Sequence, residues 1–130
     1  MTIAKVIKYP GLLLIGGLLY AALELAFRGR THWSMGLAGG VSTVLLYLIA
    51  VKNGSALWEK WIMGGAVITT VEFLFGAVFN LKLKLGVWNY SHMPLNLFGQ
   101  ICPLFTLLWI GLSALAMPLL TVVDQRFFHT

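Results

Sequence analysis

One stretch decides the fold: LWEKWIMGGAVITTVEFLFGAVFN, residues 57–80. The hydrocarbon core of a bilayer is about 30 Å thick, and a helix needs around 20 residues to cross it. The stretch is long enough, and Trp58 and Trp61 near its start are typical of residues at a membrane interface. A single carboxylate, Glu72, interrupts its second half. It is therefore predicted to be a transmembrane helix with one acid inside the membrane.

Similar apolar stretches make up most of the remaining chain. The other predicted spans are residues 10–27, 33–51 and 94–123. Pro10 suits the first turn of its helix. The last stretch is too long for one straight span, so we expect Pro103 or Pro118 to kink it, or its first turn to be re-entrant. The predicted fold class is all-α, a bundle of four transmembrane helices in a single domain, 1–130.

The composition supports a membrane protein. Hydrophobic residues make up 59% of the chain and charged residues 10%, whereas about a quarter of a soluble domain is charged. The mean hydropathy is +0.88. The net charge of +5 comes from Lys and Arg at the ends of apolar stretches, a pattern typical of membrane proteins rather than of nucleic-acid binding. We expect the bilayer to be the solvent, with no nucleic-acid partner.

The distribution of basic residues bears on orientation. Four spans put both termini on one side, with five basic residues: Lys5, Lys8, Lys52, Lys60 and Arg126. The other side has four: Arg28, Arg30, Lys82 and Lys84. Because cytoplasmic loops carry the excess of Lys and Arg, this small difference favours termini in the cytoplasm. A bias this small also permits dual insertion and an antiparallel dimer.

Unusual polar residues gather opposite the termini, on what we call the motif side. The candidates for binding a ligand or ion there are Glu24, Arg28, Glu72, Asn80, Trp88, Asn89, Tyr90, His92, Asn96 and Gln100.

Glu72 is the most informative of them. It lies about eight residues from the end of its span, or about 12 Å along a helix. A carboxylate at that depth is costly unless it is paired, hydrated or protonated. The functional interpretation is a proton carrier or cation ligand; the structural one is an acid that hydrogen-bonds neighbouring helices or pairs with an Arg.

Glu24 allows two interpretations. Arg28 lies one turn further along the same helix face, which favours a local ion pair near the interface. Alternatively, Glu24 and Glu72 share one site. Each acid belongs to a Glu-x-x-Phe sequence on an odd-numbered span, which hints at two helix hairpins related by a pseudo-twofold axis.

The amide, aromatic and histidine side chains also allow more than one interpretation. Asn96 and Gln100 are four apart, which places them on one face if both are helical, either joining helices or lining a polar cavity. Trp88 and Tyr90, with Trp33, suggest an aromatic belt at the interface or a lid over the cavity. The remaining possibility is a metal site built from His32, His92, Glu24 and Glu72, although no pair has typical ligand spacing.

The stretch VWNYSHMPLNLFGQICPLFTLLW, residues 87–109, resembles the signature of a family of bacterial membrane proteins known as "Putative ABC-transporter type IV", or CmpB-like. That family shows a W-D-Y-S, P-x-N, G-x-I-C string here, and RGRTHWSMG (28–36) and residues 72–80 also resemble it. Asn89 stands where the family usually has Asp, so a role that needs a carboxylate in this loop is not implied. The resemblance implies a multi-span membrane protein with a possible transport role, and it names no substrate.

These observations predict a small transporter or channel subunit of the bacterial plasma membrane, with a polar cavity open to the motif side. Glu72 would bind a cation or exchange a proton. We expect a homodimer, with Gly36, Gly39 and Gly40 as the candidate interface. The alternatives are a non-transporting accessory or lipid- or ligand-binding protein and, less favoured, a lipid-modifying enzyme. The sequence has no Walker A, GxSxG or CxxC motif, and we expect no cofactor.

Overall fold

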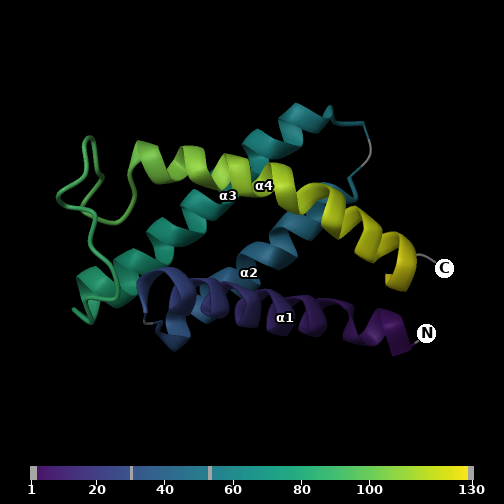
Figure 1. The fold of residues 1–130 in the computed structure, drawn as a ribbon, viewed down its shortest axis with the longest axis horizontal. Coiled ribbons are helices and arrows are strands. Elements are labelled where there is room, and N and C mark those ends of the chain that lie inside the picture. Colours follow the sequence, from purple (N-terminus) through teal and green to yellow (C-terminus); the bar gives the residue numbers. More distant parts are fainter. Residues whose placement is uncertain (1–2, 30, 53, 129–130) are drawn as a thin grey trace.

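The computed structural model describes residues 3–29, 31–52 and 54–128 (Figure 1). Arg30 and the side chain of Lys5, both counted in the charge comparison, lie outside what is described. The helices are α1 (Ile3–Arg28), α2 (Trp33–Ala50), α3 (Leu57–Gly76) and α4 (Pro103–Val123). The π-helical turns η1 (Ala77–Lys82) and η2 (Asp124–Phe128) extend α3 and α4. All four helices are long and apolar enough to cross a membrane, which confirms the predicted fold class.

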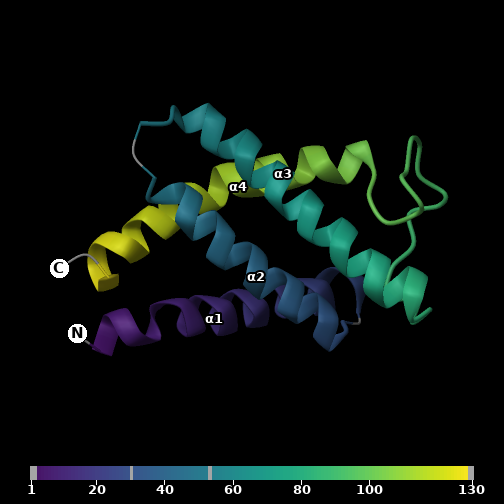
Figure 2. The ribbon, with the colours of Figure 1, turned by 180° about the vertical axis from the view of Figure 1, so that it is seen from behind.

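The helices pack as two antiparallel hairpins. α1 lies along α2, and α3 lies along α4, while α2 and α3 join the hairpins in the middle of the bundle (Figures 1 and 2). The main core forms where α2, α3 and α4 meet, around Tyr47, Ile68 and Met117. This arrangement leaves α1 and α4 on the same face of the molecule, separated along most of their length.

The two ends of the bundle differ as the sequence predicts. Both termini and the connection between α2 and α3 lie at one end (Figure 1). The short α1–α2 connection and the loop 83–102 lie at the other, which is the motif side. The loop approaches the ends of α1, α2 and α3, so residues distant in sequence meet there.

The predicted start of the fourth span was wrong. α4 begins at Pro103, in the first helical turn, where a missing N–H costs nothing. Residues 94–102 are apolar but not helical, because Leu95, Phe98 and Gly99 adopt positive φ angles of 57°, 53° and 73°. Asn96 and Gln100 therefore do not share a helix face, and both belong to the loop.

Pro10 also differs from its predicted place, because it lies inside α1 rather than in its first turn. Helices that cross membranes tolerate an interior proline where neighbouring groups satisfy the freed carbonyl. The helix therefore starts earlier than residue 10.

The glycines proposed as a dimer interface are used within the chain instead. A Cβ atom on Gly40 would lie 2.3 Å from the carbonyl oxygen of Leu13, and one on Gly39 would lie 2.6 Å from Cβ of Tyr20. These positions let α2 approach α1 closely. Because α1 covers Gly39 and Gly40, a second copy would have to meet the chain on another surface, and the homodimer itself stays a prediction.

Candidate functional site

Glu72 is held by two neutral hydrogen-bond donors. The hydroxyl of Tyr90 donates to Oε2 at 2.7 Å, and the indole N–H of Trp109 donates to Oε1 at 3.1 Å. Glu72 is half-buried on α3, while its partners come from the loop 83–102 and from α4. Both oxygens accept a bond, the arrangement expected of an ionised carboxylate. No basic side chain pairs with Glu72 in the part of the chain described.

Tyr90 holds the loop over this carboxylate. Its ring stacks on Phe105 with centroids 4.7 Å apart and an interplanar angle of 10°. Burial, followed by the nearby charge of Glu72, raises the pKa of Tyr90 above its ordinary value. The phenol therefore stays protonated and keeps its role as donor.

A large cavity runs from this site along the bundle. Its volume is about 970 Å³, and all four helices contribute to its lining. We call it the α1–α4 groove, since those helices form its sides. Glu72, Tyr20, Trp88 and Trp109 line one end, and Phe127 and Phe128 line the other. Most of the lining between them is aliphatic, so the cavity differs from the polar vestibule predicted.

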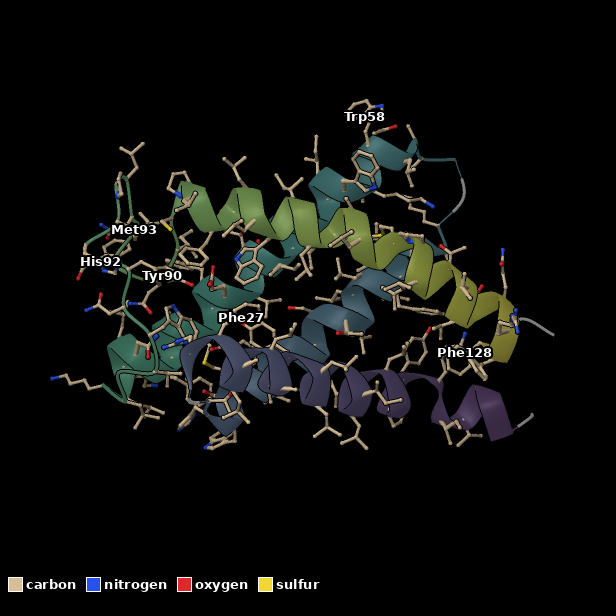
Figure 3. The ribbon with its side chains drawn as sticks, viewed as in Figure 1. Phe27, Trp58, Tyr90, His92, Met93 and Phe128 are labelled. Carbon is tan, nitrogen blue, oxygen red and sulfur yellow. The ribbon has the colours of Figure 1, made fainter. Side chains whose placement is uncertain are left out.

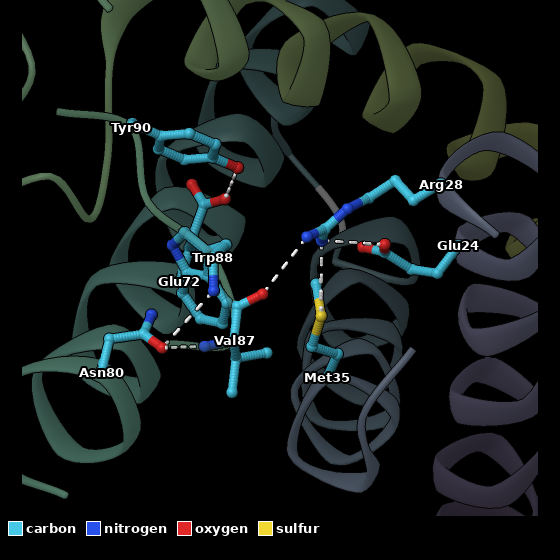
Figure 4. Close-up of polar contacts among 8 residues, drawn as sticks. All are labelled: Glu24, Arg28, Met35, Glu72, Asn80, Val87, Trp88 and Tyr90. Carbon is cyan, nitrogen blue, oxygen red and sulfur yellow. Dashed lines mark hydrogen bonds and ion pairs between the residues drawn. The ribbon is translucent and has the colours of Figure 1, made fainter. Parts of the chain in front are cut away.

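Glu24 and Arg28 form the predicted local pair. Nη1 of Arg28 lies 3.0 Å from Oε2 of Glu24, which is only 8% exposed. Nη2 of Arg28 also donates to the carbonyl oxygen of Val87 at 3.2 Å (Figure 4). Tyr20 of α1 lines the same cavity as Glu72. The two acids therefore have separate primary partners.

Asn80 fixes the start of the loop. Its Oδ1 accepts from the backbone N–H groups of Val87, at 2.7 Å, and of Trp88, at 3.4 Å (Figure 4). Its Nδ2 donates to Oε1 of Gln100 at 2.8 Å. The Trp88 indole N–H in turn donates to the Gln100 carbonyl oxygen at 3.0 Å. Asn80, Trp88 and Gln100 are thus brought together, and they brace the loop.

The three aromatic residues predicted as a belt or a lid differ in burial. Trp88 is buried, and Tyr90 points toward the interior of the bundle (Figure 3). Trp88 lines the groove and Tyr90 donates to Glu72; a lid over the cavity made by these two side chains stays a prediction. Trp33 is 66% exposed, as expected of a residue at a membrane interface.

Other candidates shape the loop or face outward. The Asn89 side-chain oxygen accepts from the backbone N–H of Ser91 at 2.9 Å, a bond that the family's usual Asp could also make. Asn96 donates to the carbonyls of Ser91 and Met93 and accepts from Gly99. His92 is exposed. Neither Asn89 nor Asn96 lines the groove.

The alternative of a metal site finds no support in the geometry. His32 caps α2, where Nδ1 accepts from the Ser34 backbone N–H at 3.2 Å. Glu24 and Glu72 have the partners already given. Among residues 3–29, 31–52 and 54–128, no group of three or more His, Cys, Asp or Glu side chains is arranged to hold an ion.

A cluster of side chains at the terminal side was not predicted from the sequence. The hydroxyl of Tyr47, which is 1% exposed, donates to the carboxylate of Asp124. The Lys8 ammonium lies 5.4 Å from the ring centroids of Tyr9 and Tyr47 and 5.8 Å from that of Phe128. This cluster, which we call the terminal cluster, joins α1 to η2 and limits the groove at that end. The sequence feature that could have indicated this cluster is Tyr47, a tyrosine near the end of an apolar span.

Comparison with known proteins gives one match. Neither the curated proteins nor the solved structures include a match to this chain. The model of the family described as "Putative ABC-transporter type IV" matches residues 33–130, which include α2, α3, the loop and α4. The match spans most of the chain and includes Glu72 and its hydrogen-bond partners Tyr90 and Trp109. The chain belongs to the family "Putative ABC-transporter type IV".

Proposed function

We propose that the chain is a small transporter or channel-like subunit in which Glu72 binds a cation or exchanges a proton. The observation that carries the proposal is an intramembrane carboxylate that lines a large cavity and whose partners among the described residues are neutral hydrogen-bond donors. A carboxylate in that position is costly to keep charged, and taking up a proton or cation relieves the cost.

The residues around Glu72 have three different roles in this proposal. Tyr90 and Trp109 orient the carboxylate through their hydrogen bonds. Glu24 and Arg28 set the charge nearby, and Asn80 and Gln100 hold the loop in place. The route to Glu72 follows the groove, since the loop covers the site on the motif side.

The test is flux through the purified full chain in liposomes. Entrapped pyranine reports proton movement, and rubidium-86 uptake reports a monovalent cation. Glu72→Gln is expected to abolish most of the flux above that of empty liposomes. Glu59→Gln is the matched control, because Glu59 is exposed in the first turn of α3 and its loss should leave flux unchanged. Equal flux for Glu72→Gln and the unaltered chain would sink the proposal.

A second candidate is a non-transporting ligand- or lipid-binding protein, which the mainly aliphatic lining of the groove favours. In that case Glu72→Gln changes thermal stability or ligand affinity, and neither probe crosses the liposome membrane faster than in empty controls.

We also propose a homodimer in the bacterial plasma membrane with cytoplasmic termini. The excess of basic residues at the termini supports the orientation. The dimer surface must avoid the glycines covered by α1; exposed aliphatic residues of α1, such as Leu14 and Leu18, offer one. Chemical crosslinking in lipid tests the homodimer. The accessibility of cysteines introduced near Lys52 tests the orientation of the termini.

A further inference from the structure

We propose that the α1–α4 groove takes a lipophilic organic cation, which reaches Glu72 sideways from the bilayer. This proposal rests on the proposed role of Glu72 and names the class of substrate for that site. The argument combines the charge at one end of the groove, the aromatic rings beside it and the apolar surface along its length.

When Glu72 is ionised, no basic side chain in the described part of the chain offsets its negative charge. The one salt bridge in the described part of the chain joins Arg28 to Glu24. Arg28 is also committed to the Val87 carbonyl oxygen, whereas Glu72 has only Tyr90 and Trp109 as donors. A bound cation would supply the opposite charge that Glu72 lacks, in a place where water is scarce.

The aromatic rings at this end favour an organic cation over a metal ion. Tyr20, Trp88 and Trp109 line the groove beside Glu72. Aromatic faces attract cations, most strongly when the cation is poorly hydrated. A metal ion instead needs several oxygen, nitrogen or sulfur ligands, and the described residues hold no such group of His, Cys, Asp or Glu.

The rest of the groove suits a hydrophobic body. Beyond Glu72 it is lined mainly by aliphatic side chains such as Leu12, Ile15, Leu112 and Leu120. Its polar exceptions include Thr43, whose hydroxyl already donates to the Gly39 carbonyl oxygen. The volume of about 970 Å³ lies at the upper end of the range for small-molecule pockets, about 300–1,000 Å³.

The sides of the groove indicate the entry route. Leu19 of α1 is 62% exposed and Leu115 of α4 is 69% exposed, and both line the groove. α1 and α4 each have the length and hydropathy of a membrane span, so leucines exposed on them face lipid. A lipophilic molecule dissolved in the bilayer can therefore enter between these two helices.

Two ions of similar size and opposite charge test the proposal without altering the protein. The full chain is placed in lipid nanodiscs, and binding of tetraphenylphosphonium and of tetraphenylborate is measured by equilibrium dialysis. Empty nanodiscs correct for partition into lipid. Saturable binding of tetraphenylphosphonium alone is expected. Absence of saturable cation binding, or equal binding of the two ions, would overturn the proposal.

Two pairs of variants then locate the site. Glu72→Gln should weaken tetraphenylphosphonium binding by at least roughly tenfold, while Glu59→Gln should not. Ala22→Trp places a large side chain in the groove from α1 and should block binding. Ala26→Trp is its control, because Ala26 is exposed on the same helix and does not line the groove. Cation binding that survives both Glu72→Gln and Ala22→Trp would place the cation elsewhere and overturn the assignment.

The outcome is separable from that of the flux experiment. If proton or rubidium flux depends on Glu72 but tetraphenylphosphonium does not bind, the substrate class is wrong and the transport function stands. If tetraphenylphosphonium binds through Glu72 but no flux is found, the ligand class stands and transport is wrong.

Discussion

Nη2 of Arg28 donates a hydrogen bond of 3.2 Å to the carbonyl oxygen of Val87. Arg28 ends α1, and Val87 belongs to the loop between α3 and α4, so the bond joins the two hairpins on the motif side. The same guanidinium reaches Glu24 through Nη1. Because its donors lie in a fixed plane, one arginine serves both partners at once.

Replacing Arg28 tests the link between the two hairpins. Arg28→Lys keeps the charge, but a compact ammonium is poorly placed to serve Glu24 and Val87 together. We expect a loss of about 1 kcal/mol in the free energy of unfolding, measured from tryptophan fluorescence in detergent. Arg126→Lys is the control, since Arg126 is exposed in η2. Equal stability of the two variants would contradict the structural role given to Arg28.

Tyr90→Phe removes one donor from Glu72 and leaves the stacking on Phe105 available. A hydrogen bond to a charged group contributes about 1.5–3 kcal/mol, so a loss of stability of that order is expected. Tyr9→Phe provides the comparison, because Tyr9 is 44% exposed and the described contacts give its hydroxyl no hydrogen bond. Thermal unfolding of both variants measures the difference. If they unfold together, Tyr90 does not hold Glu72.

Gly40→Ala tests the close approach of α1 and α2. The added Cβ would lie 2.3 Å from the Leu13 carbonyl oxygen, and the backbone there cannot move away cheaply. Overpacking of this kind costs about 1–3 kcal/mol. Gly111→Ala is the matched control, because a Cβ on Gly111 would meet nothing within 4 Å and alanine favours the helix. Thermal denaturation should give Gly40→Ala a lower melting temperature than Gly111→Ala. Equal melting temperatures would mean that α1 and α2 are further apart than the structure has them.

A double-mutant cycle tests the terminal cluster. Tyr47→Phe and Asp124→Ala each break the hydrogen bond between α2 and η2. The second change should therefore cost less once the first is made, with a coupling of about 1 kcal/mol. Denaturation of the two single variants, the double variant and the unaltered chain measures that coupling. If the losses in the free energy of unfolding of the two single variants simply add in the double variant, the two side chains act independently.

The four spans could be predicted because hydrophobicity and length together define a membrane helix. The start of the fourth could not, because residues 94–102 carry no charged side chain and lead directly into the apolar residues of α4. Their path depends on positive φ angles and on the side-chain bonds of Asn96. Hydropathy carries no information about either.

At the candidate site, Glu72 and Tyr90 were predicted from the sequence, whereas Trp109, Tyr20 and the contacts with Glu72 were not. Glu72 stands out because an acid is rare inside an apolar span. Its partners, Tyr90 and Trp109, lie 18 and 37 residues further along the chain, and only the packing of the loop and α4 brings them together. The pair of Glu24 and Arg28 was predictable because four residues make about one helical turn. The hydrogen bond from Arg28 to the Val87 carbonyl oxygen joins residues distant in sequence, so no sequence pattern predicts it.

The hairpin arrangement has a consequence for how the protein is made. The close glycine contacts of α1 and α2 lie within the first half of the chain, so that half needs nothing from the second half to complete them. The second half then supplies Val87 to Arg28 and Asp124 to Tyr47. Assembly in the membrane can thus proceed in two stages. Two separately synthesised fragments, divided in the connection between α2 and α3, are therefore expected to reassociate into one bundle.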